Sequence, residues 1–270
     1  MQLDLSTVTL GSGLSNSPEQ GIFLLRAVAL YAGEDPAGDP ACVSPTLCMV
    51  GRWLSWALPA EARQELKPLI PRLVGTAGDG LDEARSYLAL DWVIRTHVPA
   101  WLDLAGLPAP ARSLRELRPI THLMAAEQAA PLVEKAWESA RAAADATADA
   151  AEVVVGADVV NAVTESVWEA SEQAIRLTIG DVDQDVEEAV GEAAWQAASG
   201  GVARGAAMQA AWAVGWAAFA RAAKSAASTT PRAAARSAFP GARGALRPTE
   251  HHLQASAIAL YRRMVSPGDV

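Results

Sequence analysis

Hydrophobic positions recur at helical spacing along most of the chain. One apolar stripe contains Leu47, Val50, Trp53 and Leu54, and another contains Leu253, Ala257, Leu260, Tyr261 and Met264. This spacing of three and four residues is typical of helices that bury one face. No segment shows sustained alternation of apolar and polar residues with β-branched side chains, and Ala, the strongest helix former, is abundant. The pattern predicts an all-α protein.

The composition and spacing of the apolar stretches divide the chain into four regions. Residues 1–120 contain short, aromatic, Pro-punctuated apolar stretches and predict a compact helical domain. Residues 121–227 are Ala-rich, and Gly156, Gly180 and Gly200 are the natural breaks between long helices. Residues 228–248, rich in Ser, Pro, Gly, Ala and Arg, predict a flexible basic linker. Residues 249–270 predict a C-terminal amphipathic helix.

Charge is distributed unevenly around the net value of −9. Residues 121–200 hold 16 acidic and 3 basic residues, whereas residues 201–270 hold 2 acidic and 9 basic residues. We expect the helix over residues 202–227 to pack against the acidic helices, with Trp212, Trp216 and Phe219 inward and with Arg204, Arg221 and Lys224 towards Glu or Asp side chains. The alternative is a free basic arm that binds a polyanion.

One acidic segment has the spacing of a calcium-binding loop. Positions 1, 3, 5 and 12 of that loop are met by Asp181, Asp183, Asp185 and Glu192. Position 6 requires a backbone conformation that Gly adopts readily, but Val186 stands there. The acids are better explained as the first turns of a helix capped by Asp181, where the helix dipole favours negative charge. We therefore expect no calcium binding.

A second group of residues offers acid–base chemistry. Asp91, Arg95 and His97 follow one another on a predicted helix, and with Cys42 they are the candidate catalytic residues of an enzyme with a pocket in residues 1–120. Asp91 and Arg95 are four residues apart, so an ion pair on the helix face explains them without catalysis. Cys42 and Cys48, the only cysteines, are interpreted as a reduced structural pair, with a disulfide or a metal site sharing His97 or His122 as alternatives. We expect no cofactor and no metal.

The sequence gives little indication that the protein enters or crosses a membrane. The start, MQLDLSTVTL, lacks the basic and apolar regions of an export signal, which predicts a cytoplasmic protein. Residues 205–220 are uncharged, but 16 Ala-rich residues are short for a membrane span and predict a buried bundle helix.

Three stretches resemble a known family: ELKPLIPRLVGTAGDGLDEARSYLALDW, IRTHVPAWLDLAGL and LRPTEHHLQASAIALYRRM. They are similar to a family of uncharacterised, alanine-rich proteins encoded by actinobacteria and some of their phages. The similarity covers most of residues 7–120 and the last 25 residues. Family members tend to carry polar His, Cys and Glu side chains where this chain has Leu14, residues 23–26 and residues 38–40. The resemblance implies no activity, and the departures favour a binding role.

The sequence is therefore interpreted as a non-enzymatic helical protein that presents a surface to a protein partner or to a second copy. The candidate binding residues are Trp212, Trp216, Phe219, Arg221, Arg232 and Arg236. Two alternatives stay open: the enzyme described above, and a weak nucleic-acid binder. The latter would use Arg204, Arg221, Lys224, Arg232, Arg236, Arg243 and Arg247.

Overall fold

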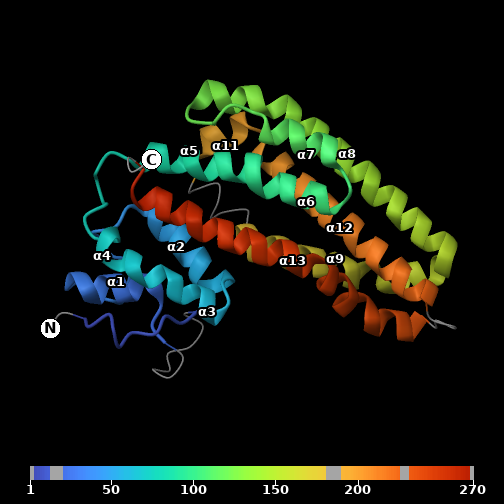
Figure 1. Cartoon of the computed structure of the whole chain (residues 1–270), viewed down its shortest axis with the longest axis horizontal. Helices are drawn as coiled ribbons and strands as arrows, with labels where there is room; N and C mark the ends of the chain where they lie inside the picture. The colour runs from blue at the N-terminus through green and yellow to red at the C-terminus, as the bar shows by residue number, and fades with distance from the viewer. Residues whose placement is uncertain (1–2, 13–20, 181–189, 226–230, 268–270) are drawn as a thin grey trace. The chain divides into compact units, whose positions relative to one another are not determined.

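The computed structural model describes residues 3–12, 21–180, 190–225 and 231–267 (Figure 1). These residues form helices and one isolated β-bridge between Leu10 and Ile22, which confirms the all-α prediction. The chain divides into two compact units. Unit 1 comprises Met1–Leu90, Leu177–Trp195 and Gln254–Val270, and unit 2 comprises Asp91–Arg176 and Gln196–Leu253. The predicted boundary near residue 120 is thus replaced by one in which both units are discontinuous in sequence.

Short helices dominate unit 1. They are α1 (Leu24–Ala32), α2 (Pro45–Ala57), α3 (Ala60–Arg63), the 3₁₀ helix η2 (Gln64–Leu69), α4 (Ile70–Leu73) and most of α5 (Asp82–Trp92). Sequence signals explain several ends: Ser44 caps α2 ahead of Pro45, and Gly33 adopts a left-handed conformation (φ 78°) after α1. The last turns of the chain complete the unit, because the Tyr261 hydroxyl donates to the Leu47 carbonyl (3.0 Å).

Unit 2 consists mainly of longer helices. They are the π-helical segment η3 (Val93–His97), α6 (Val98–Leu104), α7 (Pro108–Arg115), α8 (Leu123–Val155), most of α9 (Ala157–Ile179), α12 (Gly200–Ser225) and the first two thirds of α13 (Pro231–Val265). The short α11 (Glu192–Ala197) precedes α12. The predicted breaks at Gly156, Gly180 and Gly200 are confirmed, since α8, α9 and α12 end or begin there.

Helix α12 is the central helix of unit 2. It packs along α8 and against α6 (Figure 1), and its buried residues include Ala203, Ala207, Ala211, Val214 and Trp216. Small residues permit the close approach: a Cβ on Gly215 would lie 2.8 Å from the Val167 side chain of α9. The prediction that this helix packs against the acidic helices with its aromatics inward is confirmed, because Trp216 and Phe219 are buried and Trp212 is half-buried.

The prediction of a flexible linker before the C-terminal helix is wrong, because α13 already begins at Pro231. Residues 231–248 are helical and continue without a break at Thr249 into the predicted C-terminal helix. The described side chains of one stripe are buried at four-residue intervals: Ala234, Ala238, Ala242 and Leu246. Pro240 and Pro248 lie on the exposed face, where water can satisfy the carbonyl groups that lose a backbone partner. Burial of the stripe therefore outweighs the poor helix propensity of Pro and Gly.

Candidate interaction surface

The four candidate catalytic residues do not form one site. Cys42 belongs to unit 1, whereas Asp91, Arg95 and His97 belong to unit 2. Burial and the neighbouring Glu34 raise the pKa of the Cys42 thiol. Burial, with a smaller contribution from Asp39, raises the pKa of Cys48 to about 12. Both cysteines are free thiols in the structure, and neither environment favours the reactive thiolate.

Asp91 and Arg95 have a structural role. The guanidinium Nη1 of Arg95 donates to both carboxylate oxygens of Asp91, at 3.0 and 3.2 Å. The same carboxylate accepts the backbone N–H of Ile120 at 2.9 Å, which ties the segment before α8 to the end of α5. The ion pair expected from the four-residue spacing is therefore present.

His97 is enclosed in the π-helical turn that joins α5 to α6. A regular α-helix cannot continue through Pro99, because the proline ring would clash with the carbonyl group four residues earlier. The wider i→i+5 hydrogen bonding of the π-helical turn relieves that clash. The His97 side chain is fully buried between Trp92 and Trp101, and its Nε2 accepts the indole N–H of Trp101 at 3.3 Å. Burial disfavours the imidazolium ion and lowers the pKa of His97 to about 3.

This burial predicts a specific acid sensitivity. Because the folded pKa of His97 lies below the unfolded value of 6.5, its contribution to stability is complete above pH 6.5 and is lost as the pH falls towards 3. The free energy of unfolding should fall by up to about 1.4 kcal/mol per pH unit in this window. Urea denaturation between pH 7 and 5 should show the slope in the wild type and a flatter profile in His97→Gln. The exposed His251→Gln variant is the control and should keep the wild-type slope; a His97→Gln profile parallel to the wild type would contradict the assignment.

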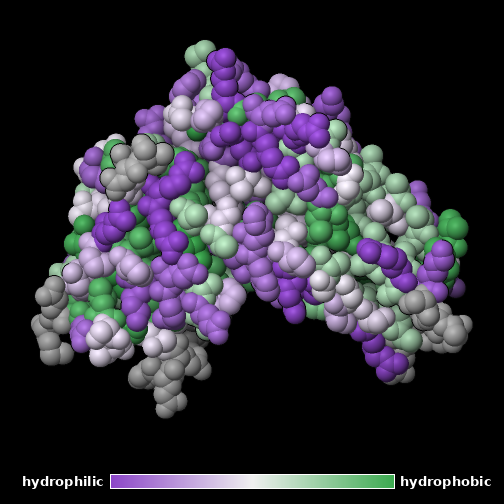
Figure 2. All heavy atoms as spheres, in the orientation of Figure 1, coloured by the Kyte–Doolittle hydropathy of each residue, from purple (hydrophilic) through white to green (hydrophobic). Residues whose placement is uncertain are grey.

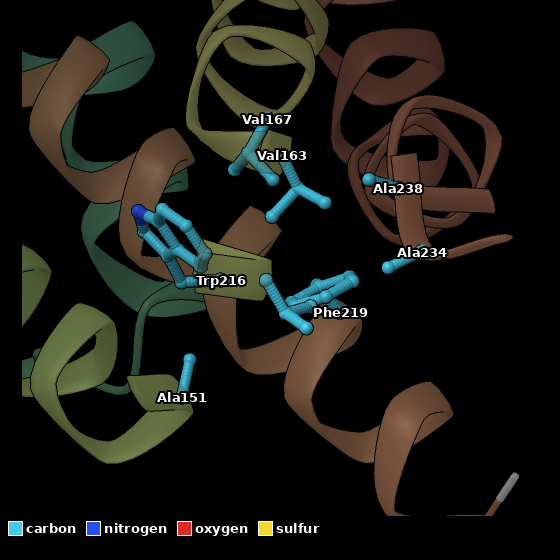
Figure 3. Close-up of a cluster of buried hydrophobic side chains, with 8 residues drawn as sticks. Ala151, Val163, Val167, Trp216, Phe219, Ala234 and Ala238 are labelled. Carbon is cyan, nitrogen blue, oxygen red and sulfur yellow. The ribbon is translucent and has the colours of Figure 1, made fainter. Parts of the chain in front are cut away.

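The candidate binding residues are distributed between the core and the surface. Trp216 and Phe219 lie in a buried cluster with Val163 and Val167 of α9 (Figure 3), so they cannot contact a partner directly. Arg221 and Arg236 are exposed, and the side chain of Arg232 lies outside the described residues.

The basic residues proposed to bind nucleic acid are not all available for that contact. Arg204 is half-buried, and Arg243 is held in an ion pair with the buried Glu250 of its own helix (Nη2 to Oε2, 2.8 Å). Arg221 donates from Nε to the Ala217 carbonyl at 3.3 Å. Within the described part of the chain, neither Arg221 nor Lys224 forms an ion pair with the acidic helices, so burial of the aromatic residues holds α12 in place.

One residue that the sequence analysis did not single out is Trp168. Trp168 is 39% exposed on α9, and its ring forms an edge-to-face contact with Trp212 at a centroid distance of 5.2 Å and an interplanar angle of 90°. Trp212 then contacts Trp216 (6.5 Å), and Trp216 contacts Phe219 (6.0 Å). The four rings form a continuous row from the surface into the core. The sequence does carry a signal for this exposure. Acidic residues lie at helical spacing from Trp168, which places it on a polar rather than an apolar face of its helix.

We call this face of α9 the Trp168 stripe. It consists of the exposed residues Asn161, Glu165, Trp168 and Glu172. They lie on one side of the helix because they are separated by four, three and four residues. The stripe thus presents one oriented indole ring between carboxylates.

No protein-family model, curated protein or solved structure matches the chain. No helix among the described residues is long and apolar enough to cross a membrane. In the same residues, no group of three or more His, Cys, Asp or Glu side chains is placed to hold a metal ion. Residues 181–189 of the calcium-like segment lie outside the described residues, and its last candidate ligand, Glu192, is the first residue of α11.

Proposed function

We propose that this chain is a non-enzymatic, cytoplasmic helical protein that binds a protein partner through the Trp168 stripe. The observation that carries the proposal is the exposed Trp168 ring held in orientation by Trp212. Trp is enriched among the residues that dominate binding energies, and a ring that is already oriented loses little conformational freedom on binding.

The charges around this ring specify the partner. Glu165 and Glu172 flank Trp168 on the same face, and among the described residues no ion pair occupies either carboxylate. A partner segment with Lys or Arg beside an apolar side chain would meet both carboxylates and the face of the indole. The preferred partner is therefore a basic, amphipathic protein segment.

The reactive groups support a binding role over catalysis. Asp91 and Arg95 form an ion pair with each other. Burial lowers the pKa of His97 to about 3, which makes its imidazole a weak base, and the raised pKa values of Cys42 and Cys48 keep both thiols protonated near neutral pH. These residues stabilise the two units.

A peptide selection tests the proposal. Random peptides selected on the full chain should be enriched in Lys and Arg, and a labelled selected peptide should bind with an affinity measurable by fluorescence anisotropy. Trp168→Ala should weaken that binding by about 30-fold, the equivalent of about 2 kcal/mol for a dominant interface residue.

The matched control is Met124→Ala, because Met124 is a large exposed side chain (64%) on α8 outside the stripe. This variant should bind the peptide like the wild type. Acidic selected peptides, or equal affinities of the wild type and Trp168→Ala, would contradict the proposal.

A further inference from the structure

Four helix ends meet at one end of unit 2. Ala151 near the end of α8, Val159 near the start of α9, Phe219 near the end of α12 and Ala234 near the start of α13 share one buried cluster (Figures 1 and 3). The end of the acidic α8 and the start of α9 therefore lie beside the end of α12 and the start of α13, which are basic. We call this end of unit 2 the tip.

The described charged residues of the tip form two corners. The acidic corner consists of Asp149, Glu152 and Asp158, and the basic corner consists of Arg221, Lys224 and Arg236; all six are exposed. In the part of the chain that the structure describes, no ion pair joins one corner to the other. Glu152 also lies in the last turn of α8, where the negative end of the helix dipole disfavours a carboxylate. Among the described residues, charges of both signs therefore stand at one end of the unit without an ion pair between the two corners.

Apolar surface accompanies the acidic corner. Val153 is 88% exposed and Val154 is 46% exposed, which is unusual for adjacent Val residues in a helix. A hollow of about 380 Å³ next to them is lined by Asp149, Glu152, Val153, Gly156 and Ala157. Figure 2 shows hydrophobic atoms directly beside hydrophilic ones where α8 ends. An apolar centre with a charged rim is the usual composition of a protein interface.

From these observations we propose that the tip is a two-fold self-association surface. The acidic corner of one copy contacts the basic corner of a second copy, and the same contact occurs again across the two-fold axis. Two-fold contacts require a surface that is complementary to itself, which an acidic and a basic corner side by side provide. Because both corners lie at one end, the contact closes at two copies and leaves no corner free to extend a chain of molecules. This inference concerns a surface other than the Trp168 stripe.

Reversing the charge of each corner gives a direct test. The acid-reversed variant carries Asp149→Lys and Glu152→Lys, and the base-reversed variant carries Arg221→Glu and Lys224→Glu. Sedimentation velocity of the full chain at low salt should show a wild-type dimer whose dissociation constant rises at least about tenfold as salt increases from about 0.05 M to 0.5 M, because the corner charges are exposed and screened. Each variant alone should be monomeric, since like charges then face each other at both contacts.

An equimolar mixture of the two variants should restore the dimer. In that pair, both contacts again join opposite charges, so the recovered species should contain one copy of each variant. The control is Glu127→Lys with Glu138→Lys, two exposed acids of α8 outside the tip, which should keep the wild-type dimer. Circular dichroism and melting curves should show that every variant is folded, because all the altered side chains are exposed.

Three results would overturn the inference: a wild type that stays monomeric at low salt, a reversed variant that stays dimeric, or a mixture that stays monomeric. A monomeric wild type that binds mixed-sequence duplex DNA through Arg221 and Lys224 would assign the basic corner to nucleic acid instead. The measurement uses the mass of the protein alone, without any peptide, so failure of the proposed Trp168 function would leave its outcome unchanged.

Discussion

Replacing Trp101 with Ala is expected to lower the free energy of unfolding by about 3–5 kcal/mol, the range for truncating a fully buried large aromatic side chain. Trp101 is 0% exposed in α6, so its removal leaves a cavity that the neighbouring helices can fill only in part. It also donates its indole N–H to Nε2 of His97, which would lose this donor inside the core. Chemical denaturation followed by circular dichroism measures the effect.

The partly exposed Trp168 provides the matched control for Trp101. Trp168→Ala removes the same side chain at a position that is 39% exposed and should cost much less, about 1 kcal/mol. Equal losses in the two variants would contradict the burial of Trp101. A Trp101→Ala protein with wild-type stability and a lost interaction would place Trp101 in a binding site.

Replacing Arg85 with Met should destabilise unit 1 by about 3 kcal/mol, because a fully buried guanidinium loses its ion pair and several charged hydrogen bonds together. The Arg85 side chain is 0% exposed. Its Nη1 and Nη2 donate to the two carboxylate oxygens of Asp79 at 2.8 and 2.5 Å, and its Nε donates to the Met264 carbonyl at 3.0 Å. The guanidinium thus ties the loop before α5 to the last turn of α13.

Two further variants of unit 1 make the Arg85 measurement specific. Arg85→Lys keeps the charge but cannot reproduce the forked contact with Asp79, so it should recover only part of the lost stability. Arg72→Met removes an exposed guanidinium that donates to the Ser266 hydroxyl at 2.7 Å, and it should change the free energy of unfolding by less than about 0.5 kcal/mol. Full recovery by Arg85→Lys would mean that charge, rather than the fork geometry, holds the loop.

Local signals predicted the helices well where one residue decides the backbone. Gly156 ends α8 with a positive φ of 84°, a conformation that other residues adopt only with strain, and the break was predicted at that residue. The inward direction of Trp216 and Phe219 was also predicted, and both residues are buried. These features depend on the conformational freedom of a single residue or on the period of one segment.

The candidate sites were harder to predict because they depend on the surroundings of each side chain. Asp91, Arg95 and His97 are close in sequence and carry the groups of an acid–base site. In the structure, Asp91 holds the Ile120 backbone and His97 is enclosed by two Trp rings. Trp168 was assigned no role, because its exposure and its contact with Trp212 depend on how α9 packs against α12.

The amino-acid sequence by itself determined the helical class, the glycine breaks and the inward direction of Trp216 and Phe219, because helix propensity and apolar period belong to the segment that carries them. Only the tertiary structure decided that residues 231–248, with Pro240 and Pro248, form a helix: Ala234 and Ala238 are buried against α9 and α12, and that burial outweighs the local preference for a linker. It also decided that the acidic and basic corners stand side by side, because their neighbourhood depends on helices that are far apart in the chain.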